Sequence, residues 1–175
     1  VKVDGASVGV SYVGVIANLA AALGEESVGV GTETVVGFIF EAVVGAAGGA
    51  MPAQEGYAKA VAEVCRRHGV LVICDEVMCG FGRTGRWFAV DHWQVVPDLM
   101  TMAKGLTSGY APLGAVAMRA EIAHAFDTRE YVGGLTYSGH PLSLAAATAV
   151  IRVMQENRLV EKCAQSSIRF REWLN

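Results

Sequence analysis

The chain has 175 residues, of which 53% are hydrophobic and 18% charged, with a formal net charge of -3. This length allows one domain with a substantial core, and the apolar content suits a sheet covered on both faces. A weakly acidic chain without runs of like charge argues against nucleic-acid and anionic-membrane partners. The four cysteines form no CxxC pair and are expected to be free, buried thiols in a reducing compartment, the cytoplasm.

The first long apolar stretch runs from Val8 to Leu23. It is too short and too interrupted by polar residues for a membrane span, and it lacks the basic flank of a signal peptide. We therefore expect a core helix there. Both ends of the chain read as cut, because it begins with Val1 and stops at Asn175 within a helical pattern.

A strand, a helix and a second strand are predicted in the next part of the chain. Residues 34–40 form a β-branched and aromatic run, and residues 70–74 form another. Between them, apolar residues recur every three or four positions from Tyr57 to Cys65, and Gly69 ends the helix. This order predicts a right-handed βαβ unit with parallel strands.

The remaining pattern continues the same layout. We predict strands at 99–103 and 114–118, a short helix at 121–126, and a long helix at 142–155 that Pro141 opens. The expected fold class is α/β with a mostly parallel sheet. Residues 1–157 are predicted to belong to one domain, and the amphipathic stretch 158–175 to begin another.

Ionisable residues follow three of the predicted strands. Glu41 follows the first, Asp75 and Glu76 follow the second, and Lys104 follows the third. Ligands of open parallel sheets bind beyond the carboxyl ends of the strands, so this edge is the candidate site. If the chain stays extended after the second strand, Asp75 and Val77 share one face, which suits a flat ring that contains nitrogen.

Four segments resemble the class III (omega) aminotransferases, which depend on pyridoxal 5'-phosphate (PLP). They are FEAVVG at 40–45, CDEVMCGFGRTG at 74–85, AKG at 103–105 and LTYSGHP at 135–141. The resemblance implies the fold type I large domain over residues 1–157, incomplete here, and the start of the C-terminal small domain over 158–175.

The resemblance also implies roles for individual residues. Lys104 would form the internal aldimine, a Schiff base, and then shuttle the proton, while Asp75 would pair with the pyridine nitrogen and Val77 would pack on the ring. Thr136 would bind the phosphate of the partner subunit's cofactor, in a homodimer with shared active sites. Glu41 would pair with a substrate-handling arginine outside this chain. A protonated pyridine makes the ring a better electron sink, which explains the acid at position 75.

The implied reaction moves an amino group from an amine or ω-amino acid to a keto acid such as pyruvate. One alternative is a truncated or degenerate homologue that binds PLP or dimerises without turnover. The chain departs from the family's pattern at two places near the strand that ends at Glu41. Ala42 stands in place of proline, and Met51-Pro52-Ala53 stands in place of Pro-Pro, so these changes affect the implied role of Glu41 most.

A second alternative is an NAD-binding α/β enzyme. Gly80, Gly82 and Gly85 satisfy G-x-G-x-x-G, and Asp98 stands near the distance of a ribose-binding acid. However, the glycines begin five residues beyond the strand end, and no helical period follows them. The four histidines have no metal-ligand spacing, so we expect no metal.

Overall fold

The computed structural model describes the backbone of Lys2–Val3 and Ala6–Ser7, and residues 35–45, 48–128, 130 and 135–174. The strands are β1 (Lys2–Val3), β2 (Ala6–Ser7), β3 (Gly37–Phe40), β4 (Val43–Val44), β5 (Met51–Pro52), β6 (Leu71–Asp75), β7 (Leu99–Met102) and β8 (Ala115–Met118). The α-helices are α2 (Tyr57–Arg67), α3 (Ala120–Ala123), α4 (Pro141–Glu156) and α5 (Leu159–Leu174), and the 3-10 helices are η3 (Ala89–Trp93), η4 (Lys104–Leu106) and η5 (His124–Phe126).

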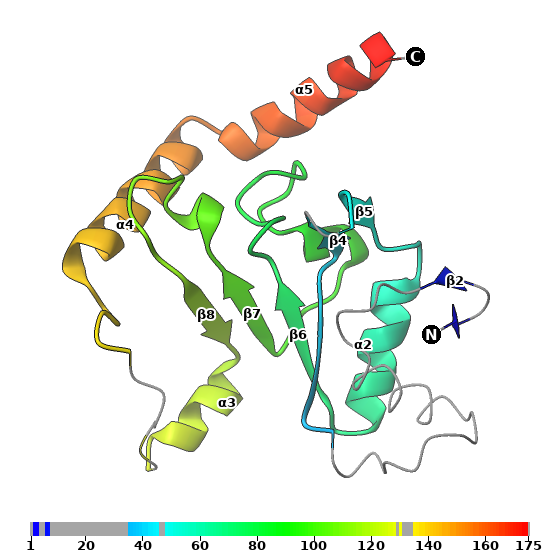
Figure 1. Ribbon diagram of the computed structural model, residues 1–175, viewed down its shortest axis with the longest axis vertical. Helices are drawn as coiled ribbons and strands as arrows, with labels where there is room; N and C mark the ends of the chain where they lie inside the picture. The colour runs from blue at the N-terminus through cyan, green and yellow to red at the C-terminus, as the bar shows by residue number, and fades with distance from the viewer. Residues whose placement is uncertain are drawn as a thin grey trace.

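A four-stranded sheet with the order β3-β6-β7-β8 forms the centre of the molecule (Figure 1). β3, β6 and β7 are parallel, and β8 is antiparallel to β7. β8 runs antiparallel because residues 103–114 turn back at the edge where β7 ends. A parallel strand would need a connection that crosses back to the opposite edge of the sheet. The predicted α/β class with a mostly parallel sheet is confirmed.

Helix α2 packs against one face of the sheet, as the strand–helix–strand pattern predicts. Strand residues alternate between half-buried and buried along β3 and β6, and the buried ones meet the apolar face of α2. This core contains Phe38, Phe40, Val72 and Cys74 from the strands and Ala58, Val61, Ala62 and Cys65 from the helix. The helix ends as predicted, because Gly69 adopts φ 66° and the chain turns into β6.

A second core cluster joins the loop after β6 to the C-terminal helices. It contains Phe81, Leu106, Ala147, Val150, Met154 and Val160. The long helix predicted at 142–155 is therefore confirmed as α4, which begins with Pro141 and packs against η4 and the loop.

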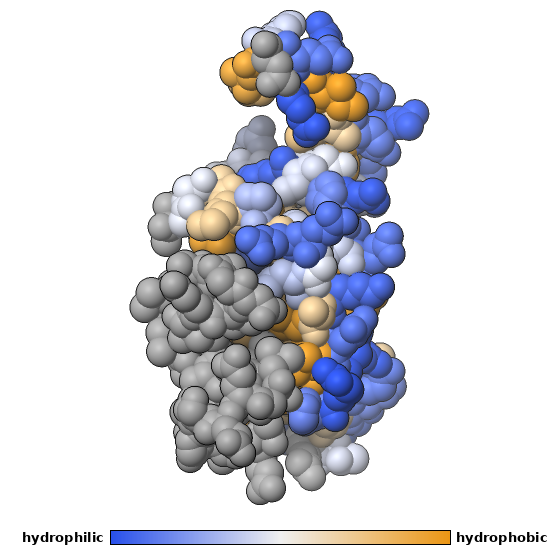
Figure 2. All heavy atoms as spheres, turned by 90° about the vertical axis from the view of Figure 1, so that its right-hand side faces the viewer, coloured by the Kyte–Doolittle hydropathy of each residue, from blue (hydrophilic) through white to orange (hydrophobic). Residues whose placement is uncertain are grey.

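Helix α5 extends away from the sheet after α4 (Figure 1). Val160, near its start, is buried, whereas Ile168, Phe170, Trp173 and Leu174 expose more than half of their surface. Figure 2 shows apolar side chains among hydrophilic ones on this projecting helix. The α4–α5 junction coincides with the boundary predicted after residue 157, and the division into two domains stays a prediction.

The helix predicted at Val8–Leu23 lies outside the described residues. Among the helices that the structure describes, none combines the length and the apolar character needed to cross a membrane. Cys65, Cys74 and Cys79 are buried free thiols, whereas Cys163 is partly exposed. Burial raises the pKa of the Cys74 thiol to about 12, with Glu76 adding to the rise, so this thiol stays protonated and inert at neutral pH.

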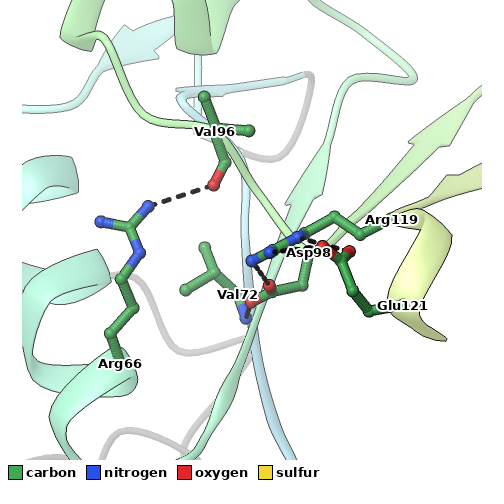
Figure 3. Close-up of polar contacts among 6 residues, drawn as sticks. All are labelled: Arg66, Val72, Val96, Asp98, Arg119 and Glu121. Carbon is green, nitrogen blue, oxygen red and sulfur yellow. Dashed lines mark hydrogen bonds and ion pairs between the residues drawn. The ribbon is translucent and has the colours of Figure 1, made fainter.

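Asp98 joins three strands at the edge of the sheet opposite the candidate site (Figure 3). Its Oδ2 accepts the Val72 N–H at 2.8 Å, and its own N–H donates to the Val72 carbonyl at 2.8 Å. Its carbonyl accepts the Arg119 N–H at 3.0 Å, and its Oδ1 pairs with the Arg119 guanidinium at 3.1 Å. The Asp98 carboxylate is therefore committed to the scaffold and is not a ribose-binding acid.

The Asp98→Ala substitution should lower the free energy of unfolding by about 1–3 kcal/mol, because it leaves the partly buried Val72 N–H without an acceptor. Asp98→Asn keeps one acceptor oxygen and should cost less. The measurement is urea unfolding of the intact protein. Glu121→Ala is the control, since Glu121 pairs with Arg119 at the solvent-exposed rim, and it should leave the midpoint nearly unchanged. Equal losses for Asp98→Ala and Glu121→Ala would contradict this account.

Glu76 follows β6 directly and is fully buried. Its side chain binds the backbone at the start of η3, where the chain returns to the end of β6. Its Oε1 accepts the Val90 N–H at 2.8 Å and its Oε2 accepts the Ala89 N–H at 3.0 Å, both at the start of η3. Burial raises the pKa of the Glu76 carboxyl, and Asp91 and Asp75 raise it further, while the two amide donors oppose the shift. The buried carboxylate thus holds residues 77–88 as a closed loop.

The raised pKa of Glu76 predicts a pH dependence of stability. The folded protein holds this proton more tightly than the unfolded chain, so the free energy of unfolding should fall as pH rises from the ordinary range of a glutamate through the raised pKa. Glu76→Gln should lose this slope, and at neutral pH it should still be less stable by about 1–3 kcal/mol because an amide NH₂ faces a backbone N–H.

Urea unfolding between pH 4 and pH 8 measures the slope in both proteins. Glu63→Gln on the exposed face of α2 is the matched control and should keep the wild-type slope. A Glu76→Gln variant with the wild-type slope would show that the titration belongs to another group.

Candidate functional site

The three parallel strands end at one edge of the sheet, the upper edge in Figure 1. Glu41 follows β3, Asp75 is the last residue of β6, and Lys104 begins η4 just after β7. Because β6 is hydrogen-bonded to both neighbours, its acid stands between the other two strand ends. The predicted placement of the three ionisable residues at one sheet edge is confirmed.

Asp75 is half-buried, and one of its two carboxylate oxygens is committed to the backbone. Oδ1 accepts the Val77 N–H at 3.0 Å, a local turn that fixes the carboxylate at the strand end. Within the described part of the chain, Oδ2 accepts no hydrogen bond. Oδ1 therefore fixes the Asp75 side chain at this edge, while Oδ2 can still accept a hydrogen bond.

The strand ends at Asp75, so the extended alternation assumed for Val77 does not continue that far. Val77 lies in a turn and is half-buried, and its N–H donates to Asp75. The carbonyls of Val77 and Met78 accept hydrogen bonds from Arg83 at 3.4 Å and 3.0 Å. Arg83 thus holds the turn from outside, and its sequence position gave no sign of this role.

The glycines of the GFGRTG loop are structural. A Cβ on Gly80 would lie 2.8 Å from the Glu76 carbonyl oxygen, and Gly82 and Gly85 adopt φ 88° and 80°. A dinucleotide fingerprint requires an α-helix to begin at such a loop, yet the next element is the five-residue 3-10 helix η3. The loop geometry therefore does not fit NAD binding.

Lys104 stands on a strained backbone at the start of η4. Its φ is 43°, in the left-handed region that residues with a Cβ seldom adopt. The next residue must be glycine, because a Cβ on Gly105 would lie 2.8 Å from Cβ of Phe81. Lys104 Nζ donates to Sδ of Met78, so the amine is directed toward the loop that follows Asp75.

Met78 lies between Gly45, in the loop after β3, and Lys104, which follows β7. The sequence pattern did not predict this position. A Cβ on Gly45 would lie 2.6 Å from Cγ of Met78, so Gly45 must lack one for Met78 to occupy this position. The Gly45 N–H donates to Oε2 of Glu41 at 2.7 Å. Glu41 thus orders its own loop, and its pairing with an arginine outside this chain stays a prediction.

Thr136 makes no hydrogen bond with Asp75 or Lys104 in the described structure. It is exposed in the turn before α4, and its hydroxyl makes no hydrogen bond with the described residues. Its predicted role at a partner subunit's site stays a prediction. No group of three metal-ligating side chains gathers in the part of the chain that the structure describes.

Comparison with known proteins identifies the family. The family model for class-III aminotransferases matches residues 15–175. The putrescine–pyruvate aminotransferase of Pseudomonas aeruginosa is 45% identical over 134 residues, covering 76% of this chain and 29% of that protein.

Solved structures give the same result. An (S)-enantioselective omega-transaminase from Thermomicrobium roseum matches with a TM-score of 0.71 and 47% identity, covering 75% of this chain and 30% of its own. The ornithine aminotransferase of Toxoplasma gondii, in which PLP partly occupies the active site, matches with a TM-score of 0.72 and 34% identity, covering 79% and 32%. The chain spans less than a third of these relatives. It belongs to the class III aminotransferase family, whose members depend on PLP.

Proposed function

We propose that this protein is a PLP-dependent aminotransferase in which Lys104 carries the cofactor and Asp75 holds its ring nitrogen. The observation that carries the proposal is the pairing of strand ends: an acid closes β6, and a lysine follows the neighbouring parallel strand β7. Family membership supports the reaction class. The roles of Lys104 and Asp75 rest on the resemblance, and the geometry of this edge supports them.

The residues at this edge fit PLP by their chemistry. The cofactor has an aldehyde that a primary amine can bind and a pyridine nitrogen that a carboxylate can hold in its protonated form. Lys104 supplies the amine, and Asp75 retains a free Oδ2 to accept from a ring N–H. The hydroxyl of Thr101, at the strand position paired with Asp75, is buried without a partner among the described residues, so this edge of the sheet also holds an unused donor.

When bound, PLP supplies an electron sink that stabilises negative charge at the substrate carbon that loses its proton. Asp75 then holds a proton at the ring nitrogen, which strengthens that sink. The Lys104 amine, once released, accepts and returns a proton at its Nζ as a general base and acid. Val77, whose N–H donates to Asp75, would pack against the flat ring, as the resemblance implies.

Two further roles rest on the resemblance and are part of the proposal. Thr136, exposed before α4, would bind the cofactor phosphate of a second subunit in a homodimer with shared sites. Glu41 would pair with a substrate-handling arginine. Its remaining oxygen is free among the described residues, although Oε2 already accepts the Gly45 N–H.

The proposed substrates are an amine or ω-amino acid as donor and a keto acid such as pyruvate as acceptor. The relative named as a putrescine–pyruvate aminotransferase supports this pair, as does the likeness to an omega-transaminase. The free thiols at Cys65, Cys74 and Cys79 favour a reducing compartment, so we propose that the protein acts in the cytoplasm.

Borohydride reduction of the intact protein with PLP should fix the cofactor to Lys104, located by peptide mass spectrometry. Lys104→Ala should lose the labelled peptide and lower the rate of amino transfer by at least about 10²-fold, the usual contribution of a positioned acid–base group. Lys59→Ala, on the exposed face of α2, is the control and should behave as wild type.

A label that persists in Lys104→Ala, or maps to another lysine, would overturn the assignment. Labelling of Lys104 without transfer from any amine tested would favour the alternative, a homologue that binds PLP without turnover.

A further inference from the structure

We propose that Thr101 is a positioning residue that holds the Asp75 carboxylate toward the cofactor's ring nitrogen. The inference deepens the proposed function and rests on it. Thr101 and Asp75 are paired positions on the parallel strands β7 and β6, which lie side by side in Figure 1. Paired residues of adjacent strands project from the same face about 4.8 Å apart, so the two side chains are neighbours.

The strand pairing is fixed at this point. The Glu76 N–H donates to the Thr101 carbonyl at 3.0 Å, directly after the Asp75 position. Glu76 is itself anchored by two bonds to η3, so β6 cannot slide against β7 without breaking them. Thr101 is therefore held beside Asp75 by the backbone and not by flexible side chains.

The Thr101 hydroxyl has no other use in the described structure. Its oxygen is buried and makes no hydrogen bond within the residues described. Burying an unpaired hydroxyl costs free energy, and valine would fill the same volume without that cost. Its neighbours on this face, Leu99 and Val116, are aliphatic, so a valine at position 101 would meet apolar side chains.

Asp75 offers the matching acceptor. Oδ1 is occupied by the Val77 N–H, and Oδ2 is free among the described residues. In the proposed contact the Thr101 O–H donates to this carboxylate, and Oδ2, which has two lone pairs, accepts from both Thr101 and the ring N–H. A hydrogen bond to the charged form stabilises that form, so the shared proton stays on the ring nitrogen and the carboxylate keeps one orientation.

The test is a pair of ligands that differ only at the ring nitrogen. Pyridoxamine 5'-phosphate needs no bond to Lys104, and its 1-deaza analogue has CH in place of the nitrogen. Titration of the apo form of the intact protein gives a dissociation constant for each. The ratio of the two constants isolates the contact between Asp75 and the nitrogen from all other contacts.

Wild type should bind the nitrogen-containing ligand more tightly, and Thr101→Val should lower this preference about tenfold, or about 1.4 kcal/mol. Affinity for the deaza analogue should stay within about twofold. Thr101→Ser keeps the hydroxyl and should restore most of the preference. Thr148→Val, which removes an exposed α4 hydroxyl bonded to the Leu144 carbonyl, is the control and should change neither constant.

The outcomes separate two failures. If wild type binds both ligands equally, the proposed role of Asp75 fails and this inference falls with it. If wild type discriminates and Thr101→Val discriminates equally well, Thr101 does not act through Asp75 while the proposed function stands. Equal weakening of both ligands in Thr101→Val would likewise overturn the inference, because it would show a packing role.

Discussion

The hydrogen bond from the Glu76 N–H to the Thr101 carbonyl, 3.0 Å long, sets the geometry on which the candidate site depends. It closes the parallel pairing of β6 with β7 at the point where both strands end, with Asp75 opposite Thr101. Lys104 follows three residues later on a backbone bent to φ 43°. Because the pairing is parallel, the acid and the lysine emerge at the same edge, and no long loop is needed to bring them together.

Rigidity at this edge comes from the buried Glu76 carboxyl group. Burying a carboxyl group is costly unless its oxygens are hydrogen-bonded, and Glu76 meets that condition through Ala89 and Val90. The same bonds join the two ends of the loop formed by residues 77–88. Strain is stored nearby, since Phe81 and Lys104 both adopt positive φ although neither is glycine. Such strain persists because the surrounding packing overdetermines it, as expected where side chains must be held in position.

Much of this arrangement could be predicted from the sequence because it follows from periodicity. The buried runs predicted β3, β6 and β7, and the spacing in 57–65 predicted α2 and hence parallel strands. The pattern could not show that the extended chain ends at Asp75, because that depends on a hydrogen bond to Val77. Nor could it find the roles of Glu76 and Met78, whose partners lie far along the chain and are joined only by folding. Thr101, inside an apolar run, gave no signal before its register was known.

The adjacent acids Asp75 and Glu76 point to opposite faces of the sheet. Asp75 lies at the candidate site, and Glu76 is buried in the scaffold. Side chains alternate along a strand, so a shift of one residue would exchange them and place Asp75 in the core. The two oxygens of Glu76 meet two backbone donors there, whereas the shorter Asp75 side chain would leave at least one donor unpaired. The buried glutamate therefore opposes the shifted register energetically. Glu76, the scaffold acid, thus determines that Asp75 is the acid at the candidate site.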